Sequence, residues 1–306
     1  MPTPMQIVDL MMVVRKEGVN MKRFGILLVV LAWILFSGKV HADSIFATEV
    51  VAHSSSLDGS GPYNDPDDLL GKPALYCAGW GSGTDHISIV EPAWGDGFIT
   101  TFNEGDWAIV KFDHRVMDDP RNPYGLDLIA YGNAFFVGNG YVTDTTNHGA
   151  YTLTGGIFQE PLKISVSRDG ENWYRYDNGP YADSLYPTNP WVWSQEKWNE
   201  TGNGWTDQEN DFAKPVNPEL TLAQLTAGTS ADAMALYDGS AGGAGFDLAE
   251  SGFGWIQYIK VEGLEGFSGG EVDAFSDVAP VPIPGAVWLL GSGLLGLFGI
   301  KRRNKA

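Results

Sequence analysis

The segment Leu162-Lys163-Ile164-Ser165-Val166-Ser167-Arg168-Asp169-Gly170 decides the fold class of this chain. From residue 162 to residue 167 apolar and polar side chains alternate, which is typical of a strand in an antiparallel sheet with one buried face. The pair Asp169-Gly170 follows at once and is typical of a hairpin tip, and Trp173 opens the next aromatic run. The stretch therefore predicts two paired strands joined by a tight turn.

Short runs of the same kind recur on both sides of this segment, separated by Gly, Asn, Asp and Pro. We expect strands over residues 45–52, 98–102, 107–112, 126–136, 162–167, 173–176, 256–261 and 272–275. Helix is expected only at 66–70 and 218–225. Residues 43–280 are therefore predicted to form one all-β domain, a jelly-roll-type antiparallel β-sandwich. Within it, residues 181–217, with their Trp-rich part from 191 onward, are expected to be an irregular insertion.

The N-terminal residues 21–42 have the features of a signal peptide. Met21-Lys22-Arg23 is a short basic start, residues 24–36 are apolar, and Val40-His41-Ala42 supplies a small-residue cleavage site. We expect export by the secretion machinery and cleavage by signal peptidase between Ala42 and Asp43. Residues 1–20 have no evident purpose, which indicates either an extended leader or translation that begins at Met21.

The C-terminal residues 281–306 form a second apolar segment. Residues 281–300 are just long enough to cross a bilayer as a helix, and Lys301, Arg302 and Arg303 follow them. Basic residues stay on the cytoplasmic side of a membrane, so the body between the two apolar segments is expected outside the cytoplasm.

The body from residue 43 to residue 280 is strongly acidic, with 36 Asp and Glu against 10 Lys and Arg. A net charge near −26 argues against nucleic acid or anionic lipid as partners, because both require a positive face. It is compatible with an extracellular domain and with divalent cations. The single cysteine, Cys77, excludes an internal disulfide and is expected to be a small buried residue.

The C-terminal segment resembles the PEP-CTERM class of bacterial sorting signals, in the variant that reads Val-Pro-Leu-Pro-Ala. Here the motif is Val281-Pro282-Ile283-Pro284-Gly285, followed by the apolar segment and the terminal basic cluster. Ile283 stands where the commonest form of the signal has Glu. The resemblance implies an exosortase-type transpeptidase as a partner and a mature protein at the cell surface or in exopolysaccharide. The alternative is a plain C-terminal membrane anchor.

The body more loosely resembles cell-surface β-sandwich proteins related to discoidin and galactose-binding-like domains. The resemblance implies no enzymatic activity and carries over no catalytic residues. The segments that carry it are Pro62-Tyr63-Asn64-Asp65-Pro66, Leu70-Gly71-Lys72-Pro73, Gly125-Leu126-Asp127-Leu128, Gly132-Asn133-Ala134-Phe135, Val166-Ser167-Arg168-Asp169-Gly170 with Trp173, Gly242-Gly243-Ala244-Gly245-Phe246-Asp247-Leu248 and Val272-Asp273-Ala274-Phe275.

Calcium is one candidate ligand, because hard cations prefer several carboxylate and carbonyl oxygens held on turns. Such oxygens occur near expected strand ends from early and late parts of the chain, which a sandwich can bring together. The candidate ligands are Asp65, Asp127, Asn133, Asp247 and Asp273. The alternative is that these residues form turns and accept hydrogen bonds from backbone N–H groups.

Glycan is the second candidate ligand, because flat aromatic rings stack on sugar rings. The candidates are Trp191, Trp193, Trp198 and Trp205 in the insertion. Exposed tryptophans would favour glycan contact, and buried ones would favour simple packing. The sequence thus predicts a non-enzymatic surface protein that binds glycan. A structural matrix component without a small ligand is the alternative, and a glycan-active hydrolase is the least favoured.

Overall fold

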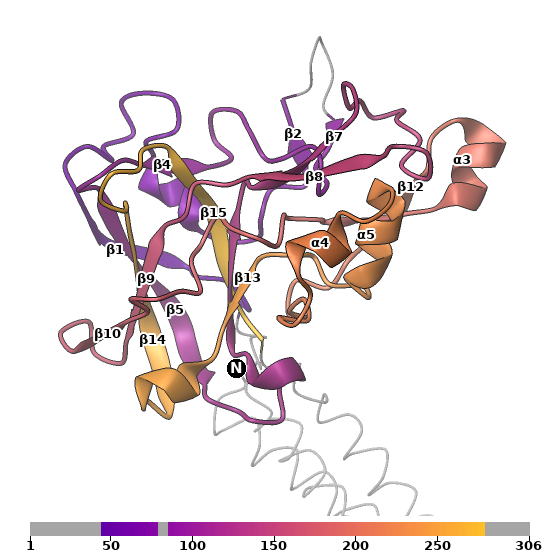
Figure 1. Ribbon diagram of the computed structural model, residues 1–306. Helices are drawn as coiled ribbons and strands as arrows, with labels where there is room; N and C mark the ends of the chain where they lie inside the picture. The colour runs from indigo at the N-terminus through magenta and orange to yellow at the C-terminus, as the bar shows by residue number, and fades with distance from the viewer. Residues whose placement is uncertain (1–43, 79–84, 279–306) are drawn as a thin grey trace, which may run out of the picture. The chain divides into compact units, whose positions relative to one another are not determined.

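The computed structural model of the protein describes residues 44–78 and 85–278. Two antiparallel sheets make up most of it (Figure 1). The five-stranded sheet has the order β1 (Glu49–His53), β5 (Trp107–Met117), β14 (Trp255–Glu262), β9 (Lys163–Ser167) and β10 (Trp173–Arg175). The four-stranded sheet has the order β13 (Ala244–Phe246), β6 (Leu128–Gly132), β15 (Gly270–Asp277) and β4 (Thr100–Phe102).

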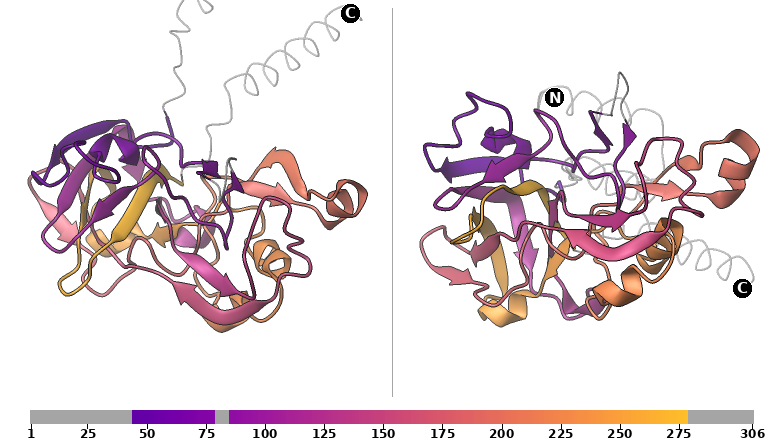
Figure 2. Two further views of the ribbon diagram at one scale, coloured as in Figure 1. Left: turned by 90° about the horizontal axis from the view of Figure 1, so that it is seen from above. Right: turned by 45° about the horizontal axis from the view of Figure 1, so that its top comes forward.

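Smaller elements lie beside these sheets. Three two-stranded sheets pair β2 (Tyr76–Cys77) with β3 (Asp85–His86), β7 (Phe135–Gly138) with β8 (Leu153–Phe158), and β11 (Trp191–Trp193) with β12 (Trp205–Glu209). The helices are short: η1 (Pro66–Leu69), η2 (Pro123–Gly125), α3 (Gln195–Thr201), α4 (Leu222–Leu225), α5 (Ser230–Leu236) and η3 (Leu248–Ser251). Figures 1 and 2 place α3, α4 and α5 on the side of the domain away from β1.

The main core lies between the two large sheets. Val110 and Ile164 of the five-stranded sheet and Leu128 and Phe275 of the four-stranded sheet belong to one buried cluster. In β5, buried residues alternate with half-buried ones from Trp107 to Phe112, as expected of a strand with one face in the core. The all-β class with antiparallel sheets is therefore confirmed.

The first described residues connect the two sheets. Phe46 forms a bridge with Ser276, the backbone N–H of Ala47 donates to Phe275 O at 3.1 Å, and the N–H of Asp277 donates to Ile45 O at 2.7 Å. A few residues later β1 pairs with β5 in the other sheet. The expected strand over 45–52 is thus two short pairings on different sheets.

The hairpin predicted from residue 162 onward is confirmed, since Ser167 of β9 lies opposite Trp173 of β10. The expected irregular insertion over 181–217 is wrong for residues 191–209, where β11, α3 and β12 lie, whereas residues 181–190 and 210–217 contain no named helix or strand. The Asn- and Gly-rich composition of this segment is typical of a loop, but residues 195–201 form the short helix α3 with ordinary caps. Ser194 accepts from the N–H of Lys197 at its start, and Gly202 has a left-handed φ of 73° at its end.

Among residues 44–78 and 85–278, no helix is both long and apolar enough to cross a membrane. The segments 1–20, 21–42 and 281–306, with Ala42, Asp43 and the whole sorting motif, lie outside the described residues. Their processing remains a prediction.

Candidate functional site

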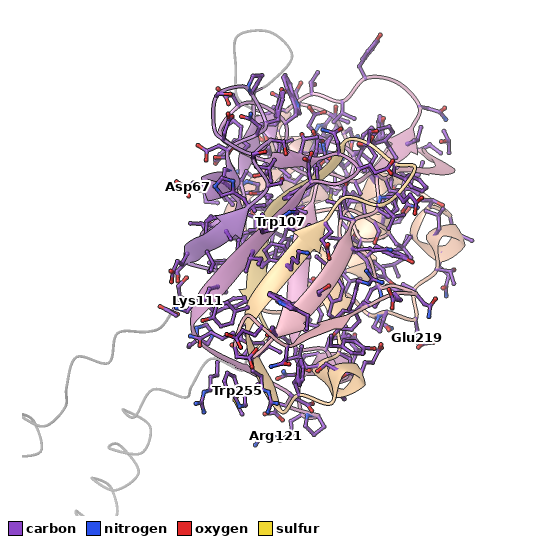
Figure 3. All side chains as sticks on the ribbon, turned by 90° about the vertical axis from the view of Figure 1, so that its left-hand side faces the viewer. Asp67, Trp107, Lys111, Arg121, Glu219 and Trp255 are labelled. Atoms are coloured by element: carbon purple, nitrogen blue, oxygen red, sulfur yellow. The ribbon has the colours of Figure 1, made fainter. Side chains whose placement is uncertain are left out.

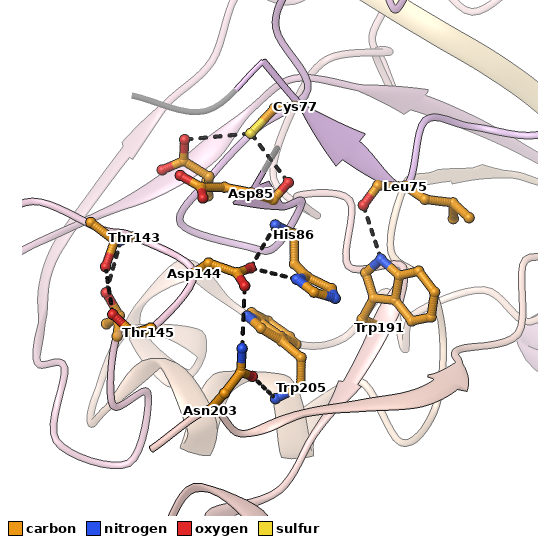
Figure 4. A network of polar contacts seen from close by, with 12 residues as sticks. Leu75, Cys77, Asp85, His86, Thr143, Asp144, Thr145, Trp191, Asn203 and Trp205 are labelled. Atoms are coloured by element: carbon orange, nitrogen blue, oxygen red, sulfur yellow. Dashed lines mark hydrogen bonds and ion pairs between the residues drawn. The ribbon is translucent and has the colours of Figure 1, made fainter. Parts of the chain in front are cut away.

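An aromatic pocket of about 280 Å³ lies where the β2–β3 and β11–β12 hairpins meet. Both hairpins are outside the two large sheets, so their side chains are not needed to fill the main core. The residues that line the pocket are Tyr76, His86, Trp191, Lys197, Asn203, Trp205, Thr206 and Asp207. We call this set the aromatic pocket; Figure 4 shows part of it.

Four rings form its walls. The His86 ring stacks on Trp205, with centroids 5.2 Å apart and an interplanar angle of 13°. Trp191 meets the edge of His86 at 5.3 Å, and Tyr76 packs on Trp191 at 5.4 Å. Such contacts position aromatic groups more firmly than area burial alone would. The pocket is therefore a defined shape and not a gap between mobile loops.

Asp144 fixes the orientation of His86. One carboxylate oxygen accepts from the backbone N–H of His86 at 3.1 Å and contacts Nδ1 of its ring. The other accepts from Nδ2 of Asn203 at 3.2 Å, and Oδ1 of Asn203 accepts from the N–H of Trp205 at 2.9 Å (Figure 4). A ring held at Nδ1 in this way leaves Nε2 for a hydrogen bond with a ligand.

The helix α3 connects β11 to β12 and supports the pocket from one side. Its Lys197 contacts the backbone oxygen of Trp205 through Nζ, and Nε1 of Trp191 donates to Leu75 O at 2.9 Å. The Trp191 bond leaves the faces of that indole ring for packing and for the pocket, whereas His86 covers one face of Trp205.

The four predicted glycan-binding tryptophans divide into two pairs. Trp191 and Trp205 line the pocket, yet their exposed fractions are only 8% and 4%. Trp193 and Trp198 are half-buried and do not line it, and Trp193 packs against His148 at 5.6 Å. Packing and pocket formation are therefore both present, and exposure alone does not separate them.

His148 stands behind the pocket and is fully buried. Its Nδ1 lies 2.8 Å from Oγ of Ser230, and its ring meets the edge of Trp205 at 4.9 Å. Burial lowers the pKa of His148 to about 4, so the ring is neutral at physiological pH. It supports Trp205 and cannot reach solvent.

Sequence analysis missed Tyr76, His86, Asp144 and Asn203. They come from segments separated by tens of residues, and none belongs to a motif with recognisable spacing. Only the fold brings them together, so no local signal could have found them.

Two of the five calcium candidates lie together. Asp127 and Asp247 each place a carboxylate oxygen within 4.8 Å of the other and of Asp118. Asp127 is fully buried, and burial raises its pKa. It accepts from the N–H groups of Asp119 and Leu248 and from Nδ2 of Asn122, so backbone and amide donors already stabilise it. Oδ1 of Asn122 is buried without a partner in the described residues, and an amide oxygen is a usual calcium ligand.

The other three candidates lie elsewhere, so the five residues do not form one site. Asp65 caps η1 through the N–H of Asp67. Asn133 contacts the Glu271 carboxylate through Nδ2, and Asp273 accepts from the N–H of Ala74 at 2.7 Å. Asp65, Asp68 and Asp96 also line a separate hollow of about 470 Å³, where burial and then Asp65 raise the pKa of Asp68 to about 6.

A further buried carboxyl group belongs to Asp183, which lies against the first residues of β15. One of its oxygens accepts from the N–H of Glu271 at 3.2 Å, and the other has no partner among the described side chains and backbone. Burial raises the pKa of Asp183 to about 8. The residue has a left-handed φ of 49°, and a Cβ at Gly132 would lie only 2.7 Å from its Cα.

No family model matches the chain, and no curated protein matches it.

Proposed function

We propose that this chain is a non-enzymatic protein of the bacterial cell surface that binds glycan in the aromatic pocket. The single observation that carries this function is the combination of four mutually packed aromatic rings with a polar rim. Asn203, Thr206 and Asp207 supply donors and acceptors for hydroxyl groups, and Lys197 supplies a cation. Small-ligand sites typically combine an apolar wall with a few polar groups in this way.

The size of the pocket suits a small ligand. Its volume of about 280 Å³ is just below the roughly 300–1,000 Å³ that is usual for sites of drug-sized ligands. We therefore expect it to take the end of an oligosaccharide or a single sugar unit, with longer chains extending into solvent.

The polar groups favour binding over hydrolysis. A glycosidase normally needs two carboxyl groups on either side of the bond that it cleaves. Among the described residues that line the pocket, Asp207 carries the one carboxylate, and Asp144 directs its oxygens to His86 and Asn203. A hydrolase therefore remains the least favoured alternative.

Export and sorting are part of the same proposal. The supporting features are the signal-like residues 21–42, the motif from Val281 to Gly285 and the terminal basic cluster. Signal peptidase, an exosortase-type transpeptidase and exopolysaccharide are the partners we propose. The two packed antiparallel sheets are compatible with the jelly-roll connectivity that we propose for the domain.

Glycan binding is tested by screening the full chain against neutral oligosaccharides with tryptophan fluorescence and calorimetry. We expect at least one to bind, and His86→Gln or Asp207→Ala to weaken it about tenfold, the loss of one well-placed polar contact. His53→Gln changes an exposed histidine away from the pocket and is the control. Absence of binding across the panel, or equal binding by all variants, would favour the structural matrix role. The low exposure of Trp191 and Trp205 supports that alternative.

Calcium is proposed at Asp118, Asp127 and Asp247, which would hold the ion through carboxylate oxygens with Asn122 nearby. We expect Ca²⁺ to raise the melting temperature of the chain relative to EGTA, because a ligand bound only by the native state stabilises it. Asp118→Asn should abolish that rise, while Asp96→Asn should not. A melting temperature indifferent to Ca²⁺ in the unmodified chain would remove calcium from the proposal.

A further inference from the structure

The outer face of the five-stranded sheet carries a series of basic side chains that lie over aromatic rings. Figure 3 labels Trp107, Lys111 and Trp255 of this set. Four such pairs follow β14 and the residues just before it: Arg168 with Phe253, Arg115 with Trp255, Lys111 with Tyr258, and Lys260 with Trp107. We call these eight residues the cation–aromatic face. It shares no residue with the aromatic pocket.

The distances are those of real cation–π contacts. Cζ of Arg115 lies 4.1 Å from the centroid of Trp255, and Cζ of Arg168 lies 4.9 Å from that of Phe253. The two lysines lie at 5.3 and 5.7 Å from their rings. Within about 6 Å an aromatic ring attracts a cation. The rings therefore favour one position of each charge over the others that its flexible side chain could adopt.

The strand register explains why these side chains share one face. Lys111, Tyr258, Ser167 and Trp173 lie opposite one another on successive strands β5, β14, β9 and β10. Residues at matched positions of neighbouring strands point to the same side of a sheet. Buried Val110, Ile259 and Val166 form the adjacent row, which points into the core. Lys111, Arg115 and Lys260 therefore point outward, whereas Arg168 lies in the β9–β10 turn at the end of this row.

The charge of this sheet is opposite to that of the rest of the domain. Its five strands contain the basic residues Lys111, Arg115, Lys163, Arg175 and Lys260, and the acidic residues Glu49, Asp113 and Glu262. Over residues 43–280 the balance is instead 10 basic to 36 acidic.

Several of these cations have no carboxylate partner despite the surplus of acid. Arg115, Lys163 and Arg168 form no ion pair with any described residue, whereas Lys111 pairs with Glu49 and Lys260 with Glu262. Arg115 and Arg168 are also exposed. In an acidic protein, unpaired cations held on rings at one face are available for an external anion.

We infer that the cation–aromatic face binds an acidic polysaccharide, a chain that carries carboxylate groups along a flat, extended backbone. Guanidinium groups bind carboxylates through two parallel hydrogen bonds, which suits Arg115 and Arg168. Several weak contacts along one polymer together give a higher affinity than any one of them. After the first contact forms, the later ones are intramolecular. This surface is separate from the proposed pocket, because it recognises the carboxylate groups of a glycan, whereas the pocket recognises hydroxyl groups.

Two other occupants fit less well. Nucleic acid binding needs a free ring face for base stacking, but cations already cover these rings. A second copy of the chain could offer acidic residues, but its net charge near −26 opposes the approach of the two molecules.

The test measures binding of the full chain to polygalacturonate and to its fully methyl-esterified form at low salt. We expect the acidic form to bind at least tenfold more tightly than the ester, and binding to weaken as salt rises. The double variant Arg115→Gln/Arg168→Gln should lose at least tenfold in affinity for polygalacturonate. The matched control is Arg121→Gln/Lys214→Gln, which removes two cations outside this face and should bind like the unmodified chain.

Retained binding by the double variant, or equal binding of ester and acid, would overturn the inference. Tighter binding of single-stranded DNA, or a sedimentation shift to dimers that the double variant abolishes, would assign the face to a different partner. Because both arginines are exposed, we expect the variant to keep its melting temperature. Should it unfold, Arg115→Gln alone must weaken polygalacturonate binding for the inference to stand. His86→Gln must leave polygalacturonate binding unchanged, which separates failure of the pocket from failure of the face.

Discussion

Asp183 places a carboxyl group in a position where ionisation is costly. Its side chain is 98% buried, one oxygen has no partner among the described residues, and burial raises its pKa to about 8. In the unfolded chain the same group has an ordinary pKa near 3.8. Folding must therefore bind a proton, and the stability contributed by protonated Asp183 is full below about pH 3.8 and is lost as pH rises through 8.

Asp183→Asn should remove this dependence, because an amide needs no proton and can still accept from the N–H of Glu271. We expect the variant to be more stable than the unmodified chain by roughly 1–3 kcal/mol at pH 7.5, with the difference vanishing near pH 4. Urea unfolding at both pH values measures it. Equal stability at pH 7.5 would mean that Asp183 ionises without penalty.

The folded-state pKa of His114 is also raised, but by a hydrogen bond to a carboxylate instead of by burial. Its Nε2 lies 2.9 Å from the buried Asp277 carboxylate, and that hydrogen bond raises the pKa of His114 from 6.5 to about 9. The charged pair joins β5 to β15, hence one large sheet to the other. Its contribution should be complete below pH 6.5 and disappear by about pH 9.

We therefore expect the unmodified chain to be more stable than His114→Gln at pH 6. This advantage in the free energy of unfolding should shrink by about 2–3 kcal/mol when the pH is raised to 9.5. His53→Gln, at an exposed histidine, is the matched control and should show no such change. A difference that is constant with pH would show that His114 acts through packing alone.

At the scale of elements, the conformation of the segment β11–α3–β12 depends on the residue that ends α3. Gly202 adopts a left-handed φ of 73°, and a Cβ there would meet no other atom within 4 Å. Gly202→Ala should therefore cost only backbone strain, roughly 1 kcal/mol. We expect faster amide exchange from residue 195 to 209 and weaker glycan binding.

Gly254→Ala is the matched control, because a Cβ there also meets nothing and no left-handed φ is required. It should leave amide exchange and glycan binding unchanged. If both variants behave alike, the end of α3 has no influence on the pocket.

Predictability also differs between elements. The hairpin 162–175 followed from strict alternation and an Asp-Gly tip, both local signals. The expected strand over 126–136 is two strands, β6 and β7, that belong to different sheets. The pair Gly132-Asn133 at the break is a turn signal, and the expectation of one continuous strand overlooked it. Asn133 at the break contacts Glu271, a residue far along the chain.

At the scale of the whole molecule, composition gave the net charge but not its distribution. Of the 10 basic residues in 43–280, six lie in the five-stranded sheet or its β9–β10 turn. The strand register gathers them, and no property of a single segment could have shown it. The same applies to the aromatic pocket, of which only Trp191 and Trp205 were among the predicted residues.

The proteolytic removal of both terminal segments is a prediction that concerns the whole chain. Protein recovered from the surface and medium of the native host should have an intact mass that starts at Asp43 and ends near Pro282. We propose cleavage at both ends because residues 21–42 have the pattern of a signal peptide and residues 281–306 resemble a sorting signal. A mass that extends to Ala306 would mean that the tail is a simple membrane anchor.

The position of β15 has a mechanical consequence. It is the last described strand, it is almost entirely buried, and it lies between β6 and β4 with residues 45–47 paired near its end. Inter-strand hydrogen bonds run perpendicular to the strands. If the protein is tethered through its C-terminus, tension from flow or cell movement would pull along β15 and load these bonds together. They would then share the force instead of opening one after another, so the domain should resist being torn from its anchor.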